Sequence, residues 1–103
     1  MAVYTRVGVV DMPINPMGYQ QITSLSSSTT LTVPSGSNAA LIQAQDNNVR
    51  WRDDGTAPTT SVGMLHLASA ERWYIGDLSA LRFIETTASA VLNVSYYFTA
   101  DLP

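Results

Sequence analysis

The stretch Val49-Arg50-Trp51-Arg52-Asp53-Asp54-Gly55 carries the clearest structural signal in the chain. Apolar and charged residues alternate with a period of two over its first four positions, which is typical of a β-strand with one buried face. Asp54-Gly55 then indicates a turn, because glycine adopts positive φ without a Cβ clash. The sequence therefore predicts a strand over residues 49–52 that ends in a turn.

The same period of two extends outward from this strand in both directions. No window carries an apolar stripe of helical spacing free of Gly or Pro, so we expect no helix. In 90–99, Leu92 and Tyr96 share one face, and Asn93 and Tyr97 share the other. In 71–75 the pattern leaves open which of Trp73 and Tyr74 points inward. About eight short strands separated by turn signals indicate an all-β fold, a single sandwich or a small barrel. The expected strands are 19–25, 29–33, 39–44, 49–52, 71–75, 81–85 and 90–99. Residues 64–67 form a short apolar segment whose pattern indicates neither strand nor helix.

The first residues look like a separate element. Val3, Thr5, Val7 and Val9 alternate with other residues, but prolines follow at 13 and 16 and cannot donate to a β-ladder. We therefore expect an extended N-terminal arm at 1–16 ahead of a β-sandwich domain at 17–103. A β-patterned arm can pair with an exposed sheet edge of another chain. The arm residues expected to contact a partner are Tyr4, Arg6, Pro13, Ile14 and Pro16.

Composition restricts the function classes. The chain has 103 residues, a net charge of -3, five positive residues that are all Arg, and no Cys. A nucleic-acid-binding protein needs a basic face, so no nucleic-acid partner is expected. The absence of Cys excludes disulfide scaffolds and thiolate zinc sites. No signal sequence or membrane span is apparent, so we expect release into the cytoplasm and no membrane partner.

Catalytic and ligand-binding patterns are weak. His66 is the only histidine, and without a Gly-x-Ser-x-Gly elbow we expect it to make a single polar contact rather than to act in catalysis. Adjacent strand residues point to opposite faces, so Asp53 and Asp54 should diverge, with a surface cation at a junction of chains as the alternative. The glycines form no phosphate-binding loop. We expect no enzymatic activity, cofactor or metal.

Aromatic and arginine side chains are the remaining candidates. We expect Trp51 and Trp73 to pack in the core, with a sugar-binding platform as the alternative. Tyrosine is enriched at interfaces, so the tyrosines are better candidates for partner contacts. Arg50 and Arg52 share one strand face, where they are either solvated or paired with a carboxylate of a neighbouring strand or subunit. The tyrosines in question are Tyr4, Tyr19, Tyr74 and Tyr97.

The central block resembles small β-sandwich proteins of tailed bacteriophages. The resemblance rests on Leu31–Ile42, on Val-Arg-Trp-Arg-Asp-Asp-Gly-Thr-x-Pro at 49–58, on Gly63-Met64, on Leu-Arg-Phe-Ile-Glu at 81–85 and on Val91–Tyr97. It covers about Thr29 to Phe98 and leaves out Met1–Met17. It implies a virion structural role, either capsid decoration (cement) or a head or tail accessory protein, and such proteins are commonly jelly rolls and trimers.

Taken with this resemblance, the sequence predicts a non-enzymatic virion structural protein on the capsid surface, assembled in the host cytoplasm. The expected protein is a jelly-roll sandwich that forms a homotrimer and bridges subunits of the major capsid protein. Its contact surfaces would be the N-terminal arm and the strand end formed by Arg50, Arg52, Asp53 and Asp54. The alternative is a carbohydrate- or receptor-binding module of a head fibre or tail, with a host surface glycan as its ligand.

Overall fold

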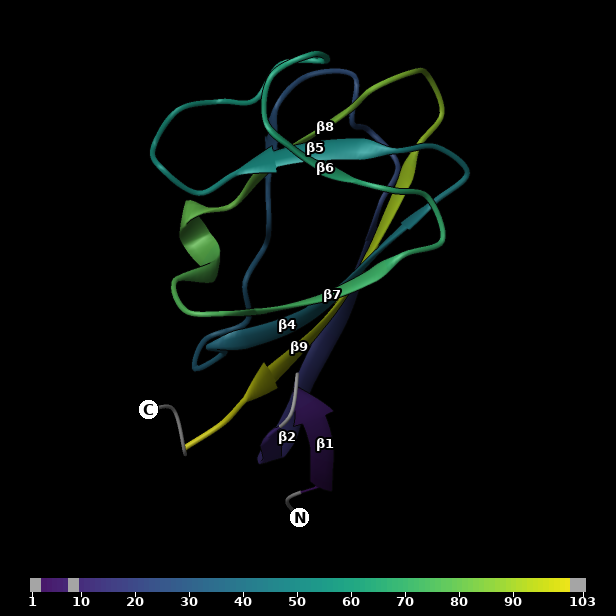
Figure 1. Ribbon diagram of the computed structural model, residues 1–103. Coiled ribbons are helices and arrows are strands. Elements are labelled where there is room, and N and C mark those ends of the chain that lie inside the picture. The colour runs from purple at the N-terminus through teal and green to yellow at the C-terminus, as the bar shows by residue number, and fades with distance from the viewer. Residues whose placement is uncertain (1–2, 8–9, 101–103) are drawn as a thin grey trace.

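The chain folds into two antiparallel β-sheets that pack face to face (Figure 1). The computed structural model describes the backbone of residues 3–7 and 10–100 and the side chains of residues 13–100. One sheet has the strand order β1-β2-β9-β4-β7 and the other has the order β3-β8-β5-β6. The strands are β1 (Val3–Val7), β2 (Val10–Ile22), β3 (Thr29–Thr30), β4 (Ala39–Gln45), β5 (Val49–Arg52), β6 (Met64–His66), β7 (Glu71–Ile75), β8 (Arg82–Glu85) and β9 (Val91–Phe98).

The strand pairing is nested around the β5–β6 connection. β5 pairs with β6, β4 with β7, β3 with β8 and β2 with β9, all antiparallel. The additional pairs β4·β9 and β5·β8 join these hairpins into the two sheets. This arrangement is the jelly roll, in which a long antiparallel ribbon wraps into a two-sheet sandwich. The expectation of a single all-β sandwich is confirmed, and its jelly-roll form agrees with the strand order.

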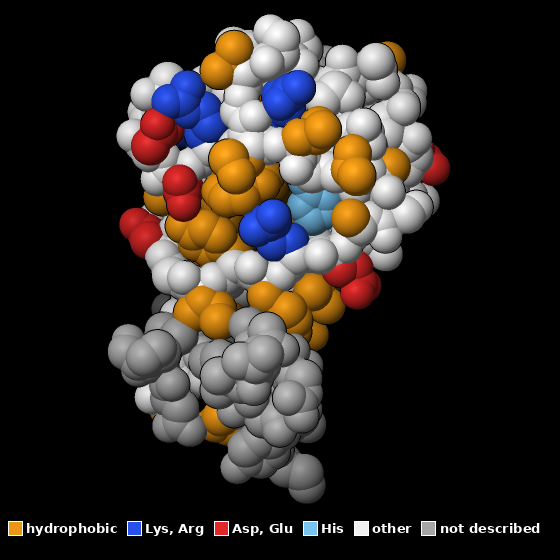
Figure 2. Space-filling view, viewed as in Figure 1, with side chains coloured by type: hydrophobic (Ala, Val, Ile, Leu, Met, Phe, Trp, Pro, Cys, Tyr) orange, Lys and Arg blue, Asp and Glu red, His pale blue; other side chains and the backbone are white. Residues whose placement is uncertain are grey.

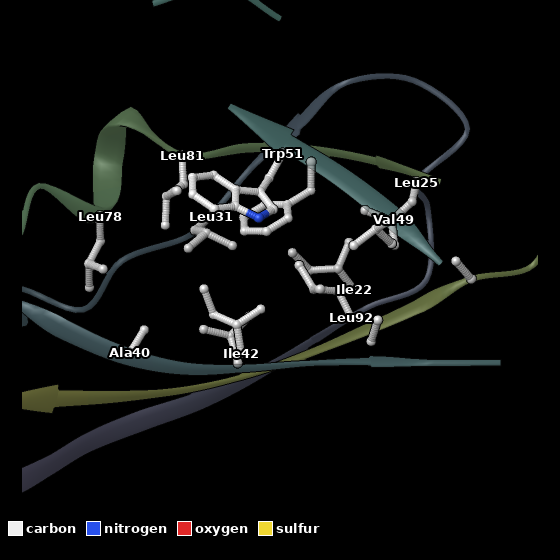
Figure 3. Packing of buried hydrophobic residues seen from close by; sticks show 14 of the residues in the cluster. Ile22, Leu25, Leu31, Ala40, Ile42, Val49, Trp51, Leu78, Leu81 and Leu92 are labelled. Atoms are coloured by element: carbon white, nitrogen blue, oxygen red, sulfur yellow. The ribbon is translucent and has the colours of Figure 1, made fainter. Parts of the chain in front are cut away.

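The hydrophobic core lies between the two sheets (Figure 3). Along the strands of both sheets, residues that point into the core alternate with residues that point to solvent. β9 follows the expected alternation, with Leu92 and Tyr96 buried and Asn93 and Tyr97 half-buried. In β7, Tyr74 packs against the core, so Trp73 points outward. The buried cluster comprises Ile22, Leu25, Leu31, Ala40, Ile42, Ala44, Val49, Trp51, Leu78, Leu81, Phe83, Ala90, Leu92, Val94 and Tyr96.

β2 continues through both prolines at which the sequence predicted a stop. The pairing with β1 ends at Ile14, and the pairing with β9 begins at Asn15. Pro13 therefore lies where β2 has a neighbour on one side, so a missing N–H is tolerated as it is at a sheet edge. Pro16 lies beside a register shift at Met17, a bulge that bends the strand. The boundary expected between residues 16 and 17 thus falls inside β2, whose first half forms a β1–β2 hairpin extending past the sandwich (Figure 1).

The connection between β7 and β8 contains a short 3-10 helix, Leu78–Ala80. Asp77 caps it, since its Oδ1 accepts a hydrogen bond from the backbone nitrogen of Ser79 at 3.1 Å. Leu78 is buried in the core. Among the described residues, no helix is long and apolar enough to span a membrane.

Candidate functional site

The end of β5 carries a bidentate ion pair between Arg52 and Asp54. The Arg52 Nε donates to Oδ1 of Asp54 at 3.0 Å, and an Nη donates to Oδ2. The hydrogen bonds from Arg52 lower the pKa of the Asp54 carboxyl group. Both side chains are solvent-exposed to a substantial degree, at 29% and 52%, so the pair adds little stability. It fixes one positive and one negative group in a defined geometry at the surface.

Asp53 points the other way, toward the five-stranded sheet. Its Oδ2 accepts a hydrogen bond from the Tyr74 hydroxyl at 2.8 Å. Burial raises the pKa of Tyr74 to about 12, and the neighbouring Asp53 adds to the shift. The Tyr74 ring meets Trp51 edge-on at 6.1 Å, and the Arg72 guanidinium lies 5.6 Å from the Trp51 ring centroid. Asp53 and Asp54 therefore diverge as expected, and the Asp53 group joins the end of β5 to β7.

An open depression of about 420 Å³ lies beside the ion pair. On this side of the sandwich, Figure 2 shows hydrophobic side chains with acidic and basic groups around them. No group of three or more His, Cys, Asp or Glu side chains suited to a metal occurs within the described part of the chain. The depression is open to solvent, and the fixed ion pair lies at its surface. It is lined by Arg52, Asp53, Asp54, Val62, Gly63 and Met64.

Arg50 braces the long β5–β6 loop from within the chain. Its Nη1 donates to the Gly63 carbonyl at 2.9 Å, and its Nε donates to the Thr60 carbonyl at 3.3 Å. Arg50 thus pairs with backbone oxygens, whereas Arg52 pairs with a carboxylate. Of the four residues predicted at this contact surface, Arg52, Asp53 and Asp54 line the depression, and Arg50 holds the loop beside it.

The N-terminal candidates lie on the other sheet, well away from β5 (Figure 1). Pro16 is exposed and Pro13 is half-buried, while Ile14 is only 6% exposed and belongs to the buried residues. Tyr4 and Arg6 lie on β1 opposite Pro13 and Asp11, and their side chains lie outside the described residues. The two predicted contact surfaces are therefore separate.

His66 is buried at 4% exposure on the inner side of β6, opposite Val49. Its Nε2 lies 2.7 Å from the carbonyl oxygen of Ala70. This is the single polar contact expected from the sequence. The bond joins the two ends of the connection between β6 and β7, which gives the histidine a structural role.

The outer face of the five-stranded sheet carries an amide network that sequence reasoning missed. Oδ1 of Asn93 accepts from the Tyr19 hydroxyl at 2.6 Å and from Nε2 of Gln21 at 3.0 Å. Nδ2 of Asn93 donates to Oε1 of Gln43 at 3.3 Å and to Oε1 of Gln45 at 3.1 Å. One amide at the centre of the sheet thus orients side chains from both neighbouring strands.

Aromatic rings accompany the amides on this face. Tyr19, Ser95, Leu41 and Trp73 form a row across β2, β9, β4 and β7. The Trp73 and Tyr97 rings pack at 5.2 Å, and Ser95 Oγ donates to the Tyr97 hydroxyl at 3.0 Å. Trp51 lies in the core as expected, but the same expectation for Trp73 was wrong, because β7 turns Tyr74 inward instead.

Only part of this face has a signal in the sequence. The alternation in 91–98 places Asn93 with Tyr97 on the outer side. Their neighbours Tyr19, Gln43 and Trp73 come from other strands, so the pairing register is needed to bring them together.

No protein-family model matches the chain, and it matches neither a curated protein nor a solved structure. Function is therefore inferred from the fold and from these surfaces.

Proposed function

We propose that the chain is a non-enzymatic structural protein of a bacteriophage virion, a capsid decoration protein that self-associates and bridges subunits of the major capsid protein. The observation that carries the proposal is the β1–β2 hairpin, whose pairing up to Ile14 lies beyond the part of β2 that pairs with β9. A decoration protein that binds only the assembled shell stabilises the shell by mass action.

The hairpin supports this role because of its position in the sheet. β1 is the edge strand of the five-stranded sheet and pairs with β2 up to Ile14. An edge strand leaves backbone donors and acceptors that a strand of another protein can pair with. Such pairing gives affinity through the main chain, and it needs no catalytic or cofactor chemistry.

Self-association is supported by the opposite sheet. β6 is the edge strand of the four-stranded sheet, and apolar side chains are exposed on it and beside it. Met64 is 55% exposed, Leu65 45%, and Val62 and Leu67 55% each. An edge strand with several exposed apolar side chains is typical of a surface that another chain covers. We propose a trimer in which this edge contacts the neighbouring copy.

Capsid binding by a truncated chain tests the hairpin. Capsids lacking this chain are mixed with the full chain or with a chain lacking residues 1–12, and bound protein is measured after sedimentation. Residues from Pro13 onward keep the whole β2–β9 ladder, so the truncated sandwich should stay folded. We expect occupancy to fall strongly in the truncated chain. Unchanged occupancy would refute the role of the hairpin, and no binding by the folded full chain would refute capsid decoration.

Light scattering with size-exclusion chromatography tests self-association. We expect a species of three times 11.1 kDa for the full chain and a shift toward 11.1 kDa for Leu65→Lys. The exposed polar position Thr87→Lys serves as a matched control on another loop. A monomeric full chain at high concentration, or a shift with Thr87→Lys alone, would contradict the β6 interface.

A further inference from the structure

We propose that the outer face of the five-stranded sheet binds a neutral oligosaccharide. The site consists of Tyr19, Trp73 and Tyr97 as aromatic platforms and of the amides around Asn93. This inference does not rest on the capsid role, because the β1–β2 pairing ends at Ile14, before Tyr19, and the β6 edge belongs to the other sheet.

The aromatic rings are at least partly exposed and are held in place. Tyr19 is 64% exposed, while its hydroxyl is tied to Asn93 at 2.6 Å. Tyr97 is half-buried and is held by Ser95 and by the Trp73 ring. Sugar rings present an apolar C–H face that stacks on such rings, as apolar groups do on aromatic side chains. Rings that are fixed before binding lose little conformational entropy when a ligand arrives.

The amides leave hydrogen-bonding groups for sugar hydroxyls. Each glutamine side chain has one carbonyl oxygen and an NH₂ group. Gln43 and Gln45 use their oxygens to accept from Asn93, so their NH₂ groups remain as donors on this face. Gln21 uses its NH₂ toward Asn93, so its oxygen remains as an acceptor. The network thus sets the orientation of three amides and presents both donors and acceptors.

The charge of the face restricts the ligand to a neutral one. The row formed by Gln21, Asn93, Gln43 and Glu71 contains a single charged residue, the exposed Glu71. Among the described side chains, the arginines lie elsewhere: Arg50, Arg52 and Arg82 on the four-stranded sheet, and Arg72 over Trp51. Without cations, an anionic glycan would gain no charge-assisted hydrogen bonds here.

The size of the face favours an oligosaccharide over a second copy of this chain. Tyr19 and Trp73 lie three strand spacings apart, about 14 Å, and residues 91–97 span about 20 Å along β9. The patch therefore measures about 300 Å², well below the about 800 Å² per partner of a standard protein interface. A few sugar units cover such an area.

Tryptophan fluorescence gives a direct test. In the Trp51→Phe chain, Trp73 is the only tryptophan and reports on this face. The probes are cellohexaose, laminarihexaose, maltohexaose and mannohexaose, with heparin as the anionic comparison. We expect a saturable change with at least one hexaose, an affinity about tenfold weaker after Tyr19→Ala, and little effect of salt. The matched control is Phe98→Ala, an exposed aromatic next to Tyr97 whose side chain takes the opposite parity on β9.

Several results would overturn the proposal. One is the lack of any saturable response to the four hexaoses up to about 10 mM, beyond the millimolar range of weak binding. A second is tighter binding of heparin than of every hexaose, which would contradict the neutral class. A third is an equal loss with Phe98→Ala and Tyr19→Ala. A fourth is the loss of self-association in the Tyr19→Ala variant, which would show that the outer face of the five-stranded sheet contacts a second copy of the chain.

Discussion

Tyr96 places a hydroxyl group at the inner side of the five-stranded sheet. The residue is 1% exposed, and its hydroxyl donates to Oε1 of Gln20 at 2.6 Å. The same oxygen accepts from the backbone nitrogen of Thr32 at 3.1 Å. Burial raises the pKa of Tyr96 to about 12. The polar contact satisfies a buried group and links β9 and β2 to the segment after β3.

The raised pKa predicts a loss of stability at high pH. In the unfolded chain Tyr96 loses its proton near pH 10, whereas in the folded chain it keeps the proton up to about 12. Its contribution is complete below pH 10 and falls as pH rises toward 12, because the unfolded state then binds fewer protons. Tyr96 alone should remove on the order of 2–3 kcal/mol over that range. Urea unfolding at successive pH values measures this slope.

Tyr96→Phe provides the control for that slope. The variant should lose about 1 kcal/mol at neutral pH, the worth of one hydrogen bond, while Gln20 keeps its bond from Thr32. Its stability should then decline less steeply between pH 10 and 12. Tyr74, whose pKa is also raised to about 12, contributes to the decline that remains. An identical slope in both proteins would show that Tyr96 titrates normally.

Gly63 occupies a position in the β5–β6 loop where only glycine fits without strain. It has a φ of +141°, and an added Cβ would lie 3.1 Å from Cβ of Pro58 and 3.2 Å from the Trp51 carbonyl oxygen. Gly55 also has positive φ, at +86°, but a Cβ there would meet nothing within 4 Å. We expect Gly55→Ala to cost about 1 kcal/mol from backbone strain and Gly63→Ala about 1–3 kcal/mol more. Urea midpoints of the two variants compare them, and equal losses would mean that the loop moves aside.

At the scale of elements, most strands could be predicted, but β2 and the neighbours of each strand could not. Alternation located 49–52, 71–75 and 91–98 because each strand has one face in the core. It could not decide which face of β7 is buried, since Trp73 and Tyr74 are both aromatic. The sequence predicts a stop at the prolines of β2, because it does not show that β1 pairs with the first part of this strand and β9 with the second.

In the candidate site too, local features could be predicted from the sequence and contacts between distant strands could not. Asp53 and Asp54 diverge as the sequence predicts, although both lie past the end of β5 at Arg52: Asp53 bonds to Tyr74 and Asp54 bonds to Arg52. The amide network around Asn93 was not foreseen, because Tyr19 is 74 residues away from it in the chain. Contacts of that kind depend on register, which local patterns do not encode.

Two truncations test the junction of β2 with the sandwich. A chain lacking residues 1–12 keeps every rung with β9, so its free energy of unfolding should stay within about 1 kcal/mol of the full chain. A chain lacking 1–16 also loses the rungs that Asn15 and Pro16 make with Phe98 and Tyr97. Each lost backbone hydrogen bond should cost about 1 kcal/mol, so this truncation should be the less stable of the two. Thermal or urea unfolding separates the two cases, and equal stability of both truncations would place the edge of the folded unit after residue 16.

At the scale of the whole molecule, the nested pairing determines which contacts need long loops. β5 and β6 are joined by residues 53–63, whereas Ile22 of β2 pairs with Leu92 of β9 across most of the chain. The entropic cost of closing a loop rises with its length, so the β5–β6 hairpin is the least costly nested pair to form first. Each outer pair then closes a loop that the inner pair has already shortened.

This order predicts slow folding with a particular sensitivity to loop length. Because most strand pairs are non-local in sequence, the main refolding phase should fall in the millisecond-to-second range. Stopped-flow tryptophan fluorescence measures this phase. Inserting six Gly/Ser residues after Gly55 lengthens the inner loop and should slow folding more than the same insertion after Ser27, in the turn between β2 and β3. Microsecond folding would contradict the non-local topology as the rate-limiting feature. A larger effect at Ser27 would mean instead that the β2–β9 and β3–β8 pairs form before β5 meets β6.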